Sequence, residues 1–319
     1  MAKRVNVLVS GAGGFVGKAL VRSLREHPNF RISCSVRSIQ GTPIPGMFAI
    51  GDIGSNTGWS DILQSQNVVI HAAARVHIMD DKALDPRLAF REVNTEGTLN
   101  LARQAAKAGV RRFVFISSIK VNGEHTLQGA PFTADDAPDP KDAYALSKLE
   151  AERGLWQIAR DTGMEIVVIR PPLVYGPGVK GNFASMVASV ARGLPLPLGA
   201  VNNKRSLVAL DNLVDLITVC IEHPAAANQV FLVSDGDDLS TSELLRRVGA
   251  AVNKPARLIS VPGSILELAA LLLGKKALVR RLLGSLQVDI DKVRDLLGWE
   301  PPVSVDEGLR RCCEARRNC

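Results

Sequence analysis

The sequence predicts an α/β protein: a doubly wound parallel sheet followed by a smaller, mostly helical C-terminal lobe. Two observations predict this fold class. Short apolar runs rich in β-branched residues alternate with helix-length segments through the first half of the chain, which is the pattern of repeated strand–helix–strand units. After Arg170 the alternation ends, and prolines and glycines become frequent. The 319 residues are enough for about two domains.

Each element follows from the local pattern. The β-branched runs predict strands at residues 5–9, 31–36, 68–70, 113–116 and 166–169. The longer apolar-periodic segments predict helices at 18–27, 86–108 and 143–161. For the proline-rich stretch 171–197 we expect only loops and short elements. Further helices are expected at 211–222, 241–251, 265–273 and 306–317.

Composition excludes several classes of protein. The 46% apolar and 22% charged residues are typical of a soluble globule. The net charge is +7, but only 4% of the residues are aromatic and the cations are scattered, so we expect no nucleic-acid partner. The apolar stretch 268–273 is too short for membrane insertion. The five cysteines lack metal-ligand spacing, which predicts a reduced, cytoplasmic protein with no metal site.

A glycine-rich turn follows the first expected strand and precedes a helix. Gly11, Gly14 and Gly17 have the spacing that lets the chain turn tightly and lets a pyrophosphate approach the N-terminus of the helix. In this strand–turn–helix context the pattern predicts dinucleotide binding by a Rossmann-type fold. The expected contacts are Gly11, Gly14, Phe15, Val16 and Gly17.

The end of the second strand indicates which dinucleotide is bound. A carboxylate there would hold the ribose hydroxyls of NAD, whereas a cation would bind the 2′-phosphate of NADP. Arg37 stands at this position between Ser35 and Ser38, and residues 30–38 contain no carboxylate. The sequence therefore predicts NADP(H), with NAD as the alternative cofactor and a solvated surface charge as the alternative role of Arg37.

Further cofactor contacts are expected after the next two strands. Asp52 and Ile53 follow a third strand, where the acid could accept a hydrogen bond from the adenine amino group. Ala72 and Ala73 follow the strand expected at 68–70, and their small side chains would let the chain pass close to the cofactor. His71 at this strand end is at least as consistent with a buried structural histidine as with a catalytic one, and we assign it no role.

Three residues form the expected catalytic group. Ser118 lies at the end of the strand expected at 113–116, and Tyr144 and Lys148 open the following helix at i, i+4 spacing, on one helical face. A phenol with an ordinary pKa of about 10 is a poor catalyst at neutral pH, and a fixed ammonium nearby stabilises the phenolate. We expect Lys148 to lower the pKa of Tyr144, and Ser118 to orient the reacting oxygen.

Together these motifs resemble the extended short-chain dehydrogenase/reductases that modify nucleotide sugars, namely 4-epimerases, dehydratases and 4-keto-reductases. The resemblance extends to residues 93–101, 170–178 and 297–301 and covers nearly the whole chain. It implies that Lys148 also holds a ribose hydroxyl and that Pro171 contacts the cofactor. It also implies that Asn182 binds the sugar nucleotide and that Arg205, with Arg281 or its neighbour Arg280, binds the diphosphate.

The resemblance implies which part of the chain binds the cofactor and which part binds the nucleotide sugar. Residues 1–172 would form the NADP(H)-binding domain. Residues 173–319 would form the nucleotide-sugar-binding lobe, with some chain returning to the first domain. Helices 86–108 and 143–161 would pair two copies into a homodimer. We expect helix 265–273 to cover the sugar pocket; contact with an anionic membrane surface through the cations that follow it is the alternative.

Two departures from the family pattern bear on the reaction. Dehydratases of this group have an Asp-Glu pair after the catalytic Ser or Thr, where this chain has Ile119 and Lys120, so a 4,6-dehydratase is not expected. Epimerases usually have a tyrosine where this chain has Asn122. We expect Asn122 and Lys120 to alter the substrate wall, which argues against ordinary interconversion of UDP-glucose and UDP-galactose.

These observations favour one reaction and leave another open. The favoured reaction is the NADPH-dependent reduction of the C4 ketone of a UDP-2-acetamido-2,6-dideoxy-hexos-4-ulose, as in bacterial surface-polysaccharide synthesis, with Tyr144 donating the proton to O4. The alternative is a UDP-hexose or UDP-N-acetylhexosamine 4-epimerase with resident NAD and the same residues. A non-catalytic dinucleotide sensor has no need of the intact Ser118, Tyr144 and Lys148.

Overall fold

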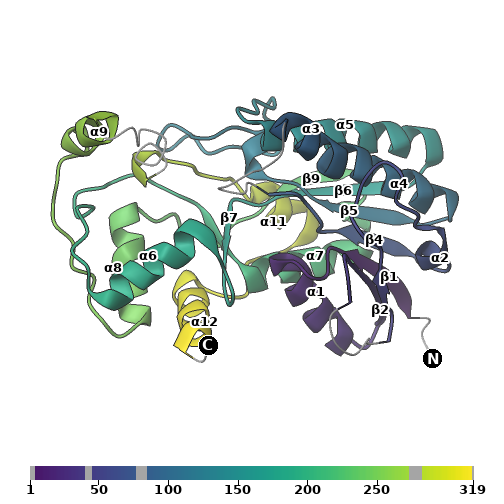
Figure 1. Ribbon diagram of the computed structural model, residues 1–319, viewed down its shortest axis with the longest axis horizontal. Coiled ribbons are helices and arrows are strands. Elements are labelled where there is room, and N and C mark those ends of the chain that lie inside the picture. Colours follow the sequence, from purple (N-terminus) through teal and green to yellow (C-terminus); the bar gives the residue numbers. More distant parts are fainter. Residues whose placement is uncertain (1–3, 40–44, 77–84, 273–281, 318–319) are drawn as a thin grey trace.

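The computed structural model describes residues 4–39, 45–76, 85–272 and 282–317. Seven parallel strands form the central sheet in the order β3-β2-β1-β4-β5-β6-β9 (Figure 1). The predicted fold class is confirmed. The strands are β1 (Val5–Ser10), β2 (Phe30–Val36), β3 (Met47–Ala49), β4 (Val68–His71), β5 (Arg112–Ile116), β6 (Glu165–Arg170) and β9 (Gln229–Leu232).

Helices cover both faces of this sheet, as Figure 1 shows. On one face, α4 (Gly97–Lys107) and α5 (Ala143–Thr162) bury Leu101 and Leu155. On the other face, α1 (Phe15–Glu26) and α7 (Leu210–Glu222) bury Leu20 and Leu213. The strands are apolar on both sides because neither face meets water, and each fully buried leucine contributes about 2 kcal/mol to stability.

The helix expected at residues 86–108 contains a change of geometry. It begins as α3 (Pro86–Phe90), continues as one π-helical segment, η1 (Arg91–Glu96), and then becomes α4. Hydrogen-bond periodicity of this kind is not visible in the apolar pattern. Such π segments often occur at functional sites, and this one places two polar side chains, Asn94 and Thr95, in the interior.

The second half of the chain contributes to the sheet as well as to a separate lobe. α7 packs on α1, and β9 pairs with β6 at the edge of the sheet. The lobe contains a two-stranded parallel sheet of β7 (Leu173–Tyr175) and β8 (Leu207–Ala209). Its helices are α6 (Gly181–Arg192), α8 (Thr241–Ala251), α9 (Gly263–Leu272) and α12 (Val305–Arg317). Short elements are α2 (Ser60–Leu63), η2 (Ile119–Val121), η3 (Pro224–Ala226) and α11 (Asp291–Leu297).

The expectation of only loops and short elements in residues 171–197 is wrong for α6. Phe183, Val187 and Val190 are buried at helical spacing against the lobe core. Gly193, with φ of +72°, ends the helix in the left-handed conformation that favours glycine. Prolines on both sides of the helix obscured this amphipathic pattern.

The helix expected at residues 265–273 is α9, and much of its apolar surface faces solvent. Ile265, Leu268 and Leu272 are 54%, 58% and 79% exposed. The cations that follow, at positions 275, 276, 280 and 281, lie outside the described residues. Among the described helices, none combines the length and apolar character needed to cross a bilayer. The described cysteines, at positions 34, 220, 312 and 313, are buried.

Candidate active site

The glycine-rich turn between β1 and α1 has the geometry of a phosphate-binding cradle. Gly11 has a φ of +77°, and a Cβ there would lie 2.6 Å from the backbone of Ala73. A Cβ on Gly17 would lie 2.1 Å from the carbonyl oxygen of Gly11, so neither position accepts a side chain. The N-cap of α1 is Gly14, which has no side chain to cap the helix. The first N–H groups of α1, those of residues 15–17, can therefore donate to a diphosphate.

The two charged residues expected near the adenosine form an ion pair. Arg37 Nε lies 2.8 Å from Asp52 Oδ1, and the side chains are 80% and 83% exposed. An exposed pair of this kind contributes no more than about 1 kcal/mol. The pair nevertheless places a carboxylate beside the cation that we expected to bind a 2′-phosphate, and a carboxylate repels a phosphate.

The remaining residues expected at the cofactor occupy two places. The N–H of Ala72 donates to the carbonyl of Ser10 at 3.1 Å, which places Ala72 and Ala73 beside the glycine turn. Ile53 packs against the core under α4 and α5. Its side chain contacts the start of α4, where a Cβ on Gly97 would lie 2.6 Å from Ile53 Cγ2.

Ser118, Tyr144 and Lys148 meet beyond the C-terminal end of β5. Ser118 is the N-cap of η2 and shares a side-chain hydrogen bond with Tyr144. Tyr144 is in the first turn of α5, whose N-cap is Asp142. Lys148 lies one turn later, is 1% exposed, and donates from Nζ to the carbonyl of Ile116 at 2.9 Å. The three predicted catalytic residues therefore form one cluster.

Burial dominates the ionisation of this cluster. Burial and then the charge of Asp142 raise the pKa of Tyr144 to about 12, although the hydrogen bond with Ser118 acts in the opposite direction. Burial lowers the pKa of Lys148 to about 7, against the charge of Glu152. The expectation that Lys148 brings the pKa of Tyr144 toward neutrality is wrong for this structure. A further positive charge must approach the phenol before it can act as a base near neutral pH.

A buried ion pair lies one turn beyond Lys148, and we did not predict it. Arg170 donates from Nε and Nη2 to the two carboxylate oxygens of Glu152, at 3.0 and 2.5 Å. Ser117 Oγ donates to Glu152 Oε1 at 2.5 Å. The signal was present, because Glu152 is an acid four residues after Lys148, on the face of the helix that must be buried.

Asn122 belongs to this network and not to a substrate wall. It is 2% exposed, accepts a hydrogen bond from Arg170 Nη1 at 2.9 Å, and donates to the carbonyl of Thr133 at 2.9 Å. The expectation that Asn122 alters the substrate wall is therefore wrong. Its amide joins the buried guanidinium to the loop that follows η2.

The π-helical segment holds α5 in place beside the cluster. Asn94 donates to Ser147 Oγ at 3.0 Å and exchanges hydrogen bonds with the backbone of Arg75, after β4. Thr95 Oγ1 donates to the carbonyl of Ser147 at 2.9 Å. Ser147 Oγ in turn donates to the carbonyl of Tyr144 at 2.7 Å. These bonds join residues 94 and 95 to the start of α5.

Comparison with known proteins identifies the family. A family model described as "NAD dependent epimerase/dehydratase family" matches residues 7–234. The chain belongs to this family. A relative from Vibrio cholerae named UDP-glucose 4-epimerase is 50% identical over 311 residues, which are 97% of this chain and 95% of the relative. The resemblance inferred from the motifs is thereby confirmed.

Two further proteins of the comparison are more distant. A GDP-6-deoxy-D-mannose reductase from Pseudomonas aeruginosa is 25% identical, with 95% of this chain and 94% of the relative covered. Among solved structures, a UDP-glucuronic acid 4-epimerase from Bacillus cereus in complex with NAD superposes with a TM-score of 0.79 at 21% identity. The superposition covers 98% of this chain and 99% of that chain. At this identity the likeness shows the fold of the epimerase/dehydratase family.

The described residues that we predicted to bind the sugar nucleotide, Asn182 and Arg205, lie in the lobe. Asn182 is exposed at the start of α6. Arg205 is partly buried and donates from Nη1 to the carbonyl of Gly284 at 3.0 Å. Arg281 and its alternative Arg280 lie outside the described residues. The roles of Asn182 and Arg205 in holding a sugar nucleotide stay predictions.

Pro171 lies between the sheet and the catalytic cluster. It follows β6, is buried, and its carbonyl accepts the N–H of Ile119 at 3.0 Å. This bond fixes η2, and therefore Ser118, against the end of β6. The structure gives Pro171 this positioning contact, and its contact with the cofactor stays a prediction.

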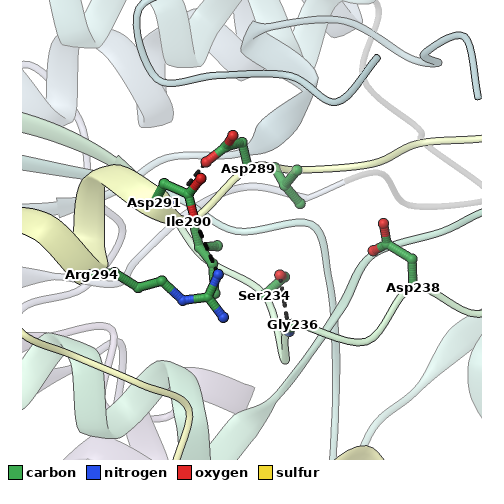
Figure 2. Close-up of a pocket in the computed structure, with 8 residues that line it drawn as sticks. Ser234, Gly236, Asp238, Asp289, Ile290, Asp291 and Arg294 are labelled. Atoms are coloured by element: carbon green, nitrogen blue, oxygen red, sulfur yellow. Dashed lines mark hydrogen bonds and ion pairs between the residues drawn. The ribbon is translucent and has the colours of Figure 1, made fainter. Parts of the chain in front are cut away.

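A separate pocket of about 230 Å³ lies beyond β9, next to the start of α11 (Figure 2). Its lining contains none of the predicted site residues. Arg294 pairs with Asp291 at 3.1 Å and with Glu300 at 2.9 Å. Asp238 accepts hydrogen bonds from Ser206 and Gln287. Arg294 is ion-paired and Asp238 is hydrogen-bonded within the protein, so we assign the pocket no part in the active site. It is lined by Ser234, Gly236, Asp238, Val288, Asp289, Ile290, Asp291 and Arg294.

Proposed function

We propose that this protein is a nucleotide-sugar 4-epimerase with a tightly held NAD. The observation that carries the reaction type is the 50% identity, along 97% of the chain, to the relative named UDP-glucose 4-epimerase. The relative named as a reductase is only 25% identical, so it supports membership of the family rather than a net reduction. Of the two reactions considered from the sequence, 4-epimerisation is therefore preferred over reduction of a C4 ketone.

The glycine turn and the catalytic cluster fit this chemistry. The positions of Gly11 and Gly17 exclude side chains where a diphosphate would approach the backbone. Tyr144 would take the proton from the O4 hydroxyl of the sugar while Ser118 fixes that oxygen. After the sugar has turned its other face, Tyr144 would return the proton. Lys148, anchored to Ile116, has further N–H donors for a ribose hydroxyl.

The bound dinucleotide would accept the C4 hydride and return it, and in its oxidised form it would add a positive charge to the site. That charge matters here because burial and Asp142 raise the pKa of Tyr144 to about 12. A cation close to the phenol favours the phenolate. An oxidised cofactor bound beside Tyr144 would therefore favour the action of this phenol as a base.

The ion pair at the adenosine end supports NAD over NADP. Arg37 is paired with Asp52 at 2.8 Å, so a 2′-phosphate bound by Arg37 would lie close to that carboxylate. An epimerase consumes no net hydride, so an exchangeable NADPH pool brings it no benefit. The structural neighbour from Bacillus cereus is itself a complex with NAD.

The test is turnover of C4 epimers without added reductant. Purified protein should interconvert UDP-glucose with UDP-galactose, or the corresponding UDP-N-acetylhexosamines, and reach the same product ratio from either side. Extraction should release NAD in roughly stoichiometric amount. Consumption of NADPH in the presence of a UDP-4-keto-6-deoxy sugar, with no interconversion of epimers, would show a reductase instead.

We further propose that two copies pair through the helices predicted at 86–108 and 143–161, as the family resemblance implies; in the structure these are α3, η1 and α4, and α5. Leu88 and Leu146 on these helices are 63% and 44% exposed. Equilibrium sedimentation should give twice the mass of the chain, and a mass equal to that of one chain would contradict the pairing.

A further inference from the structure

An ion pair connects the two elements that carry Ser118 and Tyr144. Lys120, in η2, lies with its Nζ 2.5 Å from Oδ2 of Asp142, the N-cap of α5. The two side chains are 32% and 35% exposed. The ion pair therefore joins η2 to α5, the same two elements that the hydrogen bond between Ser118 and Tyr144 joins.

Each partner of the pair also contacts the catalytic elements through a second bond. The backbone N–H of Lys120 donates to Ser118 Oγ at 3.3 Å. Oδ1 of Asp142 accepts the N–H of Ala145 at 2.7 Å, which caps the helix on which Tyr144 lies. A single carboxylate thus receives the ammonium on one oxygen and the start of the helix on the other.

We propose that Lys120 is a positioning residue for Tyr144 and acts through Asp142. By holding and partly neutralising the carboxylate, it fixes the start of α5 and sets the charge that the phenol faces. This inference rests on the proposed function, because it assumes that Tyr144 exchanges a proton with the sugar hydroxyl.

The charge balance around Tyr144 explains why this pair has an effect. Asp142 is the acid whose charge raises the pKa of Tyr144, so a cation bound to that acid must oppose the effect. Three other ionic groups near Tyr144 are already engaged. Lys148 from α5 is bound to a carbonyl, Glu152 is paired with Arg170, and Arg75 lies 5.9 Å from the ring of Phe90, which packs edge-on against Tyr144.

The experiment is the pH dependence of kcat for epimerisation by the holoenzyme and its variants. Lys120→Gln removes the ammonium that opposes the charge of the Asp142 carboxylate, which disfavours the phenolate, so the limb that rises with pH should move up by about half a unit. Asp142→Asn keeps a capping side chain but removes the acid, so the limb should move down by a similar amount. Lys120→Arg keeps the charge and should restore the wild-type profile.

A matched control lies close by. Lys141 precedes Asp142 and pairs with Asp139 at 2.5 Å on the surface, so Lys141→Gln removes the same charge without touching the capping carboxylate. Its pH profile should superimpose on that of the wild type. Thermal unfolding of each variant shows whether the fold is retained, and the partly exposed positions of Lys120 and Asp142 make this the expected result.

An unshifted limb in Lys120→Gln would overturn the inference, and so would shifts of the same sign in Lys120→Gln and Asp142→Asn. If the limb is unshifted and KM is raised, Lys120 contacts the substrate instead. The proposed function fails differently. In that case the wild-type protein would interconvert no epimers, or Tyr144→Phe would remain active. The two failures are therefore distinguishable.

Discussion

Two buried basic groups with different surroundings lie at the ends of the neighbouring strands β4 and β5. His71 ends β4, where its ring bonds to Ser10 at 2.5 Å and to Thr98 at 3.0 Å. Lys148 reaches the end of β5 and bonds to a backbone carbonyl. Both contact the ring of Phe115: the imidazole stacks on it at 6.0 Å, and the ammonium lies 4.4 Å from its centre.

The difference lies in what each group can reach. The two hydroxyl groups that bond to His71, those of Ser10 and Thr98, are buried, and burial lowers the pKa of His71 to about 3. It is therefore neutral and fully bonded, as a structural residue would be. Lys148 has the pKa near 7 and lies on the helical face of Tyr144. A buried basic group becomes useful for catalysis when it adjoins a group that a substrate can touch.

The largest expected effect concerns the phenol beside Lys148. Tyr144→Phe should reduce kcat by about a thousandfold, because it removes the proton-transferring group, with the content of bound NAD unchanged. The other tyrosine offers a matched control. The hydroxyl of Tyr175 donates to Asp235 at 2.8 Å in the lobe core, so Tyr175→Phe should lower stability and leave kcat within a few-fold. Steady-state kinetics and urea unfolding measure both; equal kcat losses would contradict the assignment.

The next largest effect is a loss of stability when the buried pair of Glu152 and Arg170 is broken. Glu152→Gln leaves Arg170 with an uncompensated buried charge and should cost about 3 kcal/mol in the free energy of unfolding. Glu150→Gln is the control, because that side chain is one-third exposed and its oxygen lies 3.4 Å from Arg91 Nε. The loss there should stay below about 1 kcal/mol. Similar losses in the two variants, measured by urea unfolding, would show that the buried pair stabilises little.

The smallest effect concerns His71 and is a pH dependence. The pKa of His71 is lowered from 6.5 in the unfolded chain to about 3 in the fold. Between these values the unfolded chain binds the proton and the folded chain does not, so stability falls as pH falls through this window. His71→Gln should lower the slope of unfolding free energy against pH by about 1.4 kcal/mol per unit.

The readout is urea unfolding at several pH values between about 4 and 6. At neutral pH, kcat of His71→Gln should remain within a few-fold of the wild type, since the imidazole is hydrogen-bonded to Ser10 and Thr98 and not to Tyr144. An unchanged slope, or a loss of kcat comparable with that of Tyr144→Phe, would remove the contrast between the two strand ends.

Much of the sheet and the composition of the catalytic cluster followed from sequence. The strands at the ends of which the cluster lies are runs of β-branched residues, and the glycine spacing and the Tyr144–Lys148 spacing are local patterns. All five predicted strands are present, each longer by one or two residues. The NADP preference was less secure, because it depended on Arg37 alone and could not anticipate its pairing with Asp52.

The tertiary structure decided everything that depends on residues distant in sequence. Glu152 meets Arg170 and Ser117, Asn94 meets Ser147, and Lys120 meets Asp142 only after the sheet and α5 are assembled. The direction of the pKa shift of Tyr144 is the clearest case. Local spacing placed an ammonium nearby and suggested a lowered pKa, but the shift is upward because burial by all the surrounding chain and then the charge of Asp142 determine it.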